Sequence, residues 1–250
     1  MKTAWRSLPV LSSFAIACGS SAAPSSTVPA PPTTGAEHAG HAGHHGHHPH
    51  EGADGKGPLV HRFEKADEWA PVFDDPTREA WQKPDQIVGA LALAPGMTVA
   101  DVGAGTGYFE ARLSAAVGAT GKVLAVDVEP DMVRYLGERA AREKTPNVTA
   151  VLATTDDPRL PQASVDRILI VDTWHHIADR VAYSRKLATA LRPGGFVLVV
   201  DFTLESAKGP PAHHRIPPAQ VASELAEAGL AASTVDAGLS EQFAVKGARR

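Results

Sequence analysis

The chain has 250 residues and a formal net charge of −4, with 24 Lys and Arg against 28 Asp and Glu. No stripe of basic residues stands out, which disfavours a nucleic-acid partner, because phosphate binding requires concentrated positive charge. The single cysteine is Cys18, so residues 19–250 offer no thiol nucleophile.

The first 18 residues are typical of an export signal. A basic start without acids precedes a short apolar run over residues 8–17, and Ala15-Ile-Ala-Cys18 resembles a bacterial lipoprotein cleavage site. The run is too short to span a bilayer comfortably. We therefore expect an exported, periplasmic lipoprotein anchored to the membrane by a lipid on Cys18. If the signal does not function, the protein is cytoplasmic.

Residues 19–58 are rich in Ser, Pro, Gly, Ala and His and cannot bury enough apolar surface to fold, which predicts a disordered tether. Seven of the 12 histidines lie within residues 38–50. Neutral imidazoles at this density bind divalent transition metals. The alternative is a solvated spacer that binds metal only incidentally. The candidate metal ligands are His44, His45, His47 and His48.

A glycine motif, Asp101-Val-Gly-Ala-Gly-Thr-Gly107, follows an apolar strand predicted over residues 97–100 and precedes a helix predicted over 108–117. Such a turn brings backbone N–H groups and a helix N-terminus up against a ligand. The third glycine comes earlier than in a dinucleotide fingerprint, and the ending of a phosphate-binding P-loop is missing. The alternative is a glycine turn used only for tight packing.

The second predicted strand, Lys122–Asp127, ends in an acid about 20 residues beyond the last glycine. A carboxylate at this position can accept hydrogen bonds from both hydroxyls of a ribose. Asp127 is the candidate for that role, with Glu129 as the second choice. The alternative is an ordinary acid at the N-terminus of the following helix.

The pattern of apolar strands alternating with helices then repeats. It predicts an α/β fold whose mostly parallel sheet is covered by helices on both faces, with ligands bound beyond the carboxyl ends of the strands. Further strands are expected over 147–153, 164–172, 196–201, 231–235 and 242–246, and further helices over 85–94, 132–141, 180–191 and 218–228; residues 192–195 are expected to separate a helix from the fifth strand.

From about residue 60 onward the chain resembles class I S-adenosylmethionine (SAM)-dependent methyltransferases, in particular the small-molecule enzymes of ubiquinone and menaquinone biosynthesis. Besides the glycine motif, the resemblance rests on Asp156-Asp-Pro-Arg-Leu-Pro161, Val165-Asp166, Asp172-Thr-Trp-His-His-Ile177 and Leu191-Arg-Pro-Gly-Gly195. It implies a Rossmann-like domain over 59–250 with seven strands, one of them antiparallel. It also implies that residues 59–95 form a helical lid.

The resemblance further implies SAM as the cofactor, with no obligatory metal. The methionine part would be held by Asp101 and the glycine loop, the ribose by Asp127 or Glu129, and the adenine amino group by Asp156 with Asp157 as its rival. The cofactor-binding set is therefore Asp101, Gly103, Gly105, Gly107, Asp127, Glu129, Asp156 and Asp172.

The segment Asp172–His176 is expected to face the methyl donor. Methyl transfer from a sulfonium is a direct displacement, so the protein mainly aligns the reactants and excludes water. A general base assists a hydroxyl or protonated amine, and His175 or His176 is the candidate, unless each merely packs the loop.

The acceptor is expected to be a small molecule with an O, N or C nucleophile. The candidate pocket residues are Trp81, Trp174 and His214. Aromatic residues are more often ordinary core, and His213-His214 also fits a solvated turn. The alternative function is an exported lipoprotein that binds a SAM-like ligand or a metal without catalysis.

Overall fold

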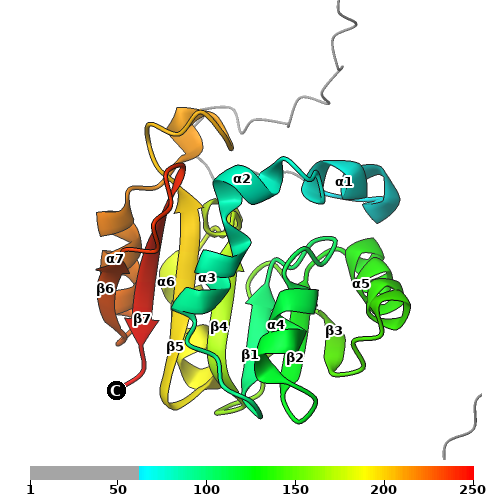
Figure 1. Cartoon of the computed structure of the whole chain (residues 1–250). Coiled ribbons are helices and arrows are strands. Elements are labelled where there is room, and N and C mark those ends of the chain that lie inside the picture. The colour runs from blue at the N-terminus through cyan, green and yellow to red at the C-terminus, as the bar shows by residue number, and fades with distance from the viewer. Residues whose placement is uncertain (1–61) are drawn as a thin grey trace, which may run out of the picture. The chain divides into compact units, whose positions relative to one another are not determined.

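The computed structural model describes residues 62–250 (Figure 1). The expected signal segment, Cys18, the tether over 19–58 and the candidate metal ligands His44, His45, His47 and His48 all lie outside the described residues. Within the described part of the chain, no helix has the length and apolarity needed to cross a membrane.

One seven-stranded sheet organises the domain, in the order β3-β2-β1-β4-β5-β7-β6. Six strands run in the same direction, and β7 is inserted antiparallel to them between β5 and β6. The expected Rossmann-like fold with one antiparallel strand is therefore confirmed. The strands are β1 (Thr98–Val102), β2 (Lys122–Asp127), β3 (Val148–Leu152), β4 (Val165–Val171), β5 (Leu191–Phe202), β6 (Ala231–Val235) and β7 (Gln242–Ala248).

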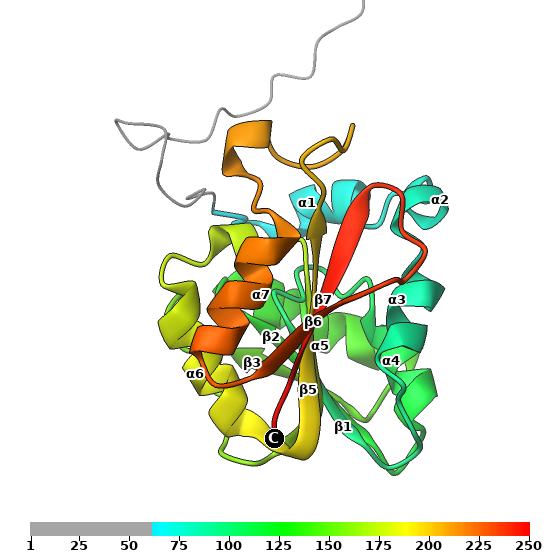
Figure 2. The same cartoon turned by 90° about the vertical axis from the view of Figure 1, so that its left-hand side faces the viewer.

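Helices cover both faces of the sheet, because successive residues of each buried strand point to opposite sides. On β4, Ile168 and Ile170 pack in a cluster with Leu187 and Leu225, whereas Leu169 packs with residues of the opposite layer. Figure 2 shows the sheet edge-on between these two layers. The helices are α1 (Ala66–Phe73), α2 (Arg78–Gln82), α3 (Pro84–Ala90), α4 (Glu110–Val117), α5 (Pro130–Glu143), α6 (Arg180–Ala190) and α7 (Pro218–Glu227), with short 3-10 turns η1 (Trp174–His176) and η2 (Ala212–His214).

The first two helices lie across the carboxyl ends of the strands, above the glycine motif (Figure 1). Two contacts hold the two ends of α1 there. The backbone N–H of Ala66 donates to Asp131 at 2.7 Å, and Arg139 pairs with Asp74 at 2.9 Å. Residues 62–82 therefore cover the carboxyl ends of the strands, where the candidate site lies, whereas α3 packs on a face of the sheet beside α4 (Figure 1).

Two boundaries differ from the sequence prediction. The fifth strand begins at Leu191, not at 196, because Gly194, with φ +76°, lets a bulge continue the strand where a stop was expected. The predicted helix over 85–94 ends at Ala90, and Ala92 adopts φ +47° after it. At Gly194 a left-handed residue lies inside a strand, where the sequence suggested that the strand had not begun. At Ala92 a left-handed residue follows the helix, where the sequence suggested that the helix continued.

Two further corrections bear on the glycine motif. Strand β1 runs to Val102, so Asp101 belongs to the strand and is fully paired with its neighbours. Helix α4 begins at Glu110, two residues later than expected. The turn between strand and helix therefore has the expected length of seven residues but lies two residues later, over 103–109.

Candidate active site

The glycine loop packs directly against the segment that follows β4. Gly103, Gly105 and Gly107 all have positive φ, at +81°, +56° and +91°. A Cβ on Gly103 would lie 2.2 Å from Thr173 Oγ1, a distance that no side chain tolerates. The loop therefore admits no side chain at this point, and the ends of β1 and β4 are brought together.

The carboxylate of Asp127 is fixed at the tip of β2. Its Oδ2 accepts from the Gly105 N–H at 2.8 Å, and its Oδ1 accepts from the Glu129 N–H at 2.9 Å. Burial raises the pKa of Asp127 above its usual value, while these backbone donors act in the opposite direction. The predicted ribose ligand thus lies in contact with the glycine loop.

Glu129 is engaged differently. Its carboxylate accepts two hydrogen bonds from Arg62, at 3.1 and 3.0 Å, and its side chain is buried. This pair ties the start of the described chain to the end of β2. The contact favours Asp127 over Glu129 as the acid that faces a ligand.

A second carboxyl pair lies beneath the turn. Asp101 and Glu110 are both 3% exposed, and neither carboxylate oxygen of Glu110 has a hydrogen-bond partner among residues 62–250. Burial raises the pKa of Asp101 to about 7, and burial and the neighbouring Asp101 raise that of Glu110 well above its usual value. Burial and the closeness of the two carboxyls thus favour the protonated form of this pair.

Asp172 closes the other side of the loop. It has φ +54°, which is unusual for a residue with a side chain, and its Oδ1 accepts from Gln242 of β7. Arg78 of α2 lies 3.6 Å from its Oδ2. Burial raises the pKa of Asp172 to about 7 against the opposing effect of Arg78.

His175 forms a buried pair with Asp201 at the end of β5. Its Nδ1 lies 2.9 and 3.0 Å from the two carboxylate oxygens, and both residues are no more than 5% exposed. Asp201 also accepts from the backbone N–H groups of His175 and Phe202. In the tautomer that donates from Nδ1 to this carboxylate, Nε2 is the ring nitrogen left to accept a proton.

An aromatic cluster of α1 and its approach covers this region. Phe63 contacts Trp69, Phe73 and His176 edge-to-face, with ring centroids 5.0, 5.3 and 5.8 Å apart. The Phe73 ring also lies 3.5 Å from where a Cβ on Gly105 would be. The rings therefore bridge from the glycine loop to the η1 turn.

The three predicted pocket residues do not come together. Trp174 is fully buried in the core, and its Nε1 donates to Glu224 at 2.9 Å, so it is placed as a packing residue. Trp81 is half-buried against Phe202, with ring centroids 5.9 Å apart, and His214 is half-buried in η2. Trp81 and His214 are partly exposed to solvent, so both stay candidates for a contact with the acceptor.

Asp156 and Asp157 lie on the turn after β3, facing solvent. The Asp156 side chain is 81% exposed and accepts from Thr154 Oγ1 at 2.8 Å. Asp157 is 43% exposed and pairs with Lys186 at 3.3 Å. Hydrogen bonds lower the pKa of both, so both are ionised acceptors at neutral pH and both remain candidates for the adenine contact.

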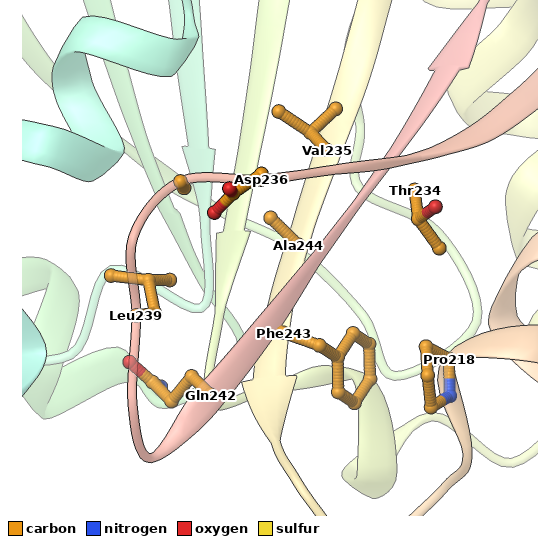
Figure 3. A pocket seen from close by; sticks show the side chains of 9 residues that line it. Pro218, Thr234, Val235, Asp236, Leu239, Gln242, Phe243 and Ala244 are labelled. Carbon is orange, nitrogen blue, oxygen red and sulfur yellow. The ribbon is translucent and has the colours of Figure 1, made fainter.

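A pocket of about 210 Å³ opens beside Gln242, between the β6–β7 hairpin and the start of α7 (Figure 3). None of the predicted acceptor residues lines it, although it adjoins the Asp172 contact through Gln242. Its lining residues are Pro218, Thr234, Val235, Asp236, Ala237, Leu239, Gln242, Phe243 and Ala244.

Sequence reasoning assigned no role to several residues of this site. Asp201 ends a predicted strand at the ligand edge, and that position was the signal that could have identified it. Arg78, Gln82 and Gln242 carried no local signal, because their contacts join segments up to 160 residues apart. Among residues 62–250 there is no cluster of three or more His, Cys, Asp or Glu side chains suited to a metal.

Residues 99–195 match the family model described as a methyltransferase domain. The ubiquinone/menaquinone biosynthesis C-methyltransferase UbiE of Shewanella frigidimarina is 33% identical over 125 residues, which cover 49% of this chain and 49% of that protein. The UbiE of Shewanella woodyi is 31% identical over 118 residues, covering 46% and 47%. The chain thus spans about half the length of the curated relatives it matches.

Two solved structures share the fold. A SAM-dependent methyltransferase from Aquifex aeolicus has a TM-score of 0.69 and 29% identity, covering 74% of this chain and 99% of that one. The [4+2]-cyclase SpnF has a TM-score of 0.57 at 15% identity, covering 67% and 80%, and shows the fold alone. Because a cyclase has this fold, the architecture by itself does not determine the reaction.

A glycine loop at the first strand and a fixed acid at the second define a nucleoside-binding α/β domain. Together with the methyltransferase-domain match over residues 99–195 and the Aquifex aeolicus structure, these features support a class I SAM-dependent methyltransferase. The residues present fit that cofactor. The three glycines hold the loop at positive φ, Asp127 accepts from its Gly105 N–H, and Asp101 and Asp172 add two further carboxyl groups at the ends of β1 and β4.

Proposed function

We propose that this chain transfers a methyl group from SAM to a small-molecule acceptor, with His175 as the general base. The observation that carries the proposal is the contact of Gly103 with Thr173, two residues before His175. Through that contact, the loop that fits the cofactor adjoins the turn that bears a histidine oriented by Asp201. The base and the donor site thereby share one edge of the sheet.

The residues proposed to hold SAM are the glycine loop and Asp101 for its methionine part, Asp127 for its ribose, and Asp156 or Asp157 for its adenine. Bound SAM supplies an electrophilic methyl group on a sulfonium. The aromatic cluster of Phe63, Trp69 and Phe73 excludes water from above, which favours displacement over hydrolysis.

His175 is proposed to accept the proton of the acceptor at Nε2. Asp201 holds Nδ1–H and stabilises the imidazolium that forms, because its carboxylate already lies within hydrogen-bond distance. The acceptor is proposed to contact Trp81 and His214. His176 is the second candidate base, since its ring lies 4.2 Å from that of His175.

The cofactor-binding step is tested by calorimetry on the full chain with S-adenosylhomocysteine. Wild-type protein should bind, and Gly105→Val or Asp127→Ala should abolish binding, because one fills the loop and the other removes the ribose ligand. Formation of S-adenosylhomocysteine from SAM should then appear with some member of a panel of phenols, quinols and amines. Binding without any turnover would instead favour the non-catalytic alternative.

Export and anchoring through Cys18 are a separate proposal, supported by the composition of residues 1–18. Cell fractionation of wild type and Cys18→Ala tests it. We expect a membrane-associated wild-type pool that becomes soluble in the variant. An unchanged distribution would contradict lipid attachment.

A further inference from the structure

Arg78 is the first residue of α2, and its guanidinium reaches down toward the glycine loop. Its Nη1 donates to the Phe73 carbonyl and its Nε donates to Gln82 Oε1, both at 2.7 Å. The guanidinium carbon lies 4.1 Å from the centroid of the Tyr108 ring. The side chain is only 16% exposed. A planar cation is therefore held rigidly above the residues that follow Gly107.

The third nitrogen of this guanidinium, Nη2, lies on the side of Asp172. It lies 3.6 Å from Asp172 Oδ2, longer than a hydrogen bond, so this nitrogen still has donors to offer. The charge of Arg78 opposes the burial that raises the pKa of both Asp101 and Asp172, so both carboxyls feel this cation. Arg139, which donates to the Thr106 carbonyl of the loop at 3.0 Å, is already paired with Asp74 and Glu143.

The amino-acid end of SAM is a zwitterion, with an α-ammonium and an α-carboxylate on one carbon. Asp101 and Asp172 offer negative charge to the ammonium, but they would repel the carboxylate unless a cation lies beside them. Arg78 is a cation in that position, with donors on a planar fork that matches a carboxylate.

We infer that Arg78 binds the α-carboxylate of SAM and of S-adenosylhomocysteine, exchanging its contact with Asp172 for one with the ligand. Asp172 then pairs with the α-ammonium. This assignment rests on the proposed function only for the identity of the cofactor, not for methyl transfer. It makes α2 part of the cofactor site, whereas the sequence indicated a lid alone.

Arg112 provides a matched control. It also lies over Tyr108, with its guanidinium carbon 5.4 Å from the ring centroid, and it also binds α2, through Glu79 at 2.7 Å. Its other partner is the exposed Asp85, so it faces away from Asp101 and Asp172. Arg112→Gln therefore removes a cation that fastens α2 without removing one that faces the ligand site.

The test measures binding to the full chain by calorimetry with two ligands that differ only in the carboxylate, S-adenosylhomocysteine and its decarboxylated analogue. Arg78→Gln should weaken S-adenosylhomocysteine binding about 10- to 100-fold, the usual effect of removing a charged hydrogen-bond partner. It should change the affinity for the decarboxylated analogue by no more than about twofold, because the analogue has no carboxylate for Arg78 to bind. Arg112→Gln should leave both affinities within the same limit.

Arg78→Lys keeps the charge but loses the fork, so its loss for S-adenosylhomocysteine should be intermediate. If the Arg78→Gln variant does not fold, Arg78→Lys replaces it in the same comparison: its affinity should fall for S-adenosylhomocysteine but not for the decarboxylated analogue. Equal losses for the two ligands would overturn the inference, because Arg78 would then act only by holding α2. If wild-type protein binds neither ligand, the cofactor assignment fails together with this inference. If binding is normal and no acceptor is methylated, methyl transfer alone fails.

Discussion

The glycine-loop half of the site and the segment that covers it, residues 62–82 (the cover), are held in place by different kinds of contact. In the loop half, the contacts that fix Asp127 come from residues 2 and 22 positions away. In the cover, Arg62 reaches Glu129 over 67 positions, and Gln82 reaches Gln242 over 160. The glycine-loop half is thus specified by short motifs, whereas the cover depends on the assembled fold.

The largest expected effect is on the loop half. Gly103→Ala places a Cβ 2.2 Å from Thr173 Oγ1 at φ +81°, so it should lower the free energy of unfolding by about 2–4 kcal/mol. The matched control is Gly137→Ala in α5, where nothing lies within 4 Å and helix propensity predicts a gain of about 0.5–1 kcal/mol. Urea unfolding followed by circular dichroism measures both. Equal effects would mean that the loop is not packed as described.

The next effect separates the two histidines. His175→Gln should lower turnover with an identified acceptor by about 10²- to 10⁴-fold, the usual contribution of a general base, and leave S-adenosylhomocysteine affinity unchanged. Asp201→Asn should lower turnover less and shift the acidic limb of the pH–rate profile, because it alters the orientation and basicity of the ring. His176→Gln is the control. If it costs as much as His175→Gln, the base has been misassigned.

A pH effect should follow from the carboxyls beneath the loop. Asp101 and Asp172 have pKa values raised to about 7, so their stabilising contribution is greatest below their unfolded pKa and is lost as pH rises toward 7. The ligand-free protein should therefore lose stability between about pH 4 and pH 7. Affinity for the cationic ammonium of S-adenosylhomocysteine should rise between about pH 6 and pH 8, as these groups ionise.

Glu110→Ala sharpens that expectation, because the contact with Glu110 lowers the pKa of Asp101. The pKa of Asp101 should then rise, and the rise in affinity should move to higher pH. Calorimetry in buffers of different ionisation enthalpy counts the protons released on binding. A count that does not change between wild type and variant would contradict this effect of Glu110.

The smallest effect is expected at the exposed edge of the cover. Arg62→Ala releases Glu129, but Asp127 remains fixed by backbone donors, so S-adenosylhomocysteine affinity should stay within about twofold. Calorimetry again gives the comparison. A much larger loss or gain would show that Glu129, not Asp127, takes the ribose.

The sequence predicted most of the framework, because apolar runs and glycine turns are local signals. Strand β2 has the predicted bounds Lys122–Asp127, and the antiparallel β7 was implied by resemblance alone. Residues 192–195 were misjudged because proline and glycines normally end an element, yet here they form a bulge within β5. Trp174 was assigned to a pocket because it follows a strand at the ligand edge, but its ring turns into the core to meet Glu224.

The parts of the site that were not predicted share one cause. Arg78, Gln82 and Gln242 owe their places to partners on distant elements, and no spacing in a single sequence encodes such pairs. The roles of Asp127, His175 and the other site residues remain predictions that the experiments above test.

The insertion of β7 has a consequence for biosynthesis. The chain is made from its N-terminus, so Gln82 and Asp172 are both synthesised before Gln242. Each of them hydrogen-bonds to the Gln242 side-chain amide in the folded domain. A nascent chain that has completed β5 already contains the whole glycine loop but lacks the strand that braces Asp172. Ligand-binding competence is therefore a property of the finished hairpin, and fragments truncated before residue 242 should expose an unbraced acid instead of forming half a site.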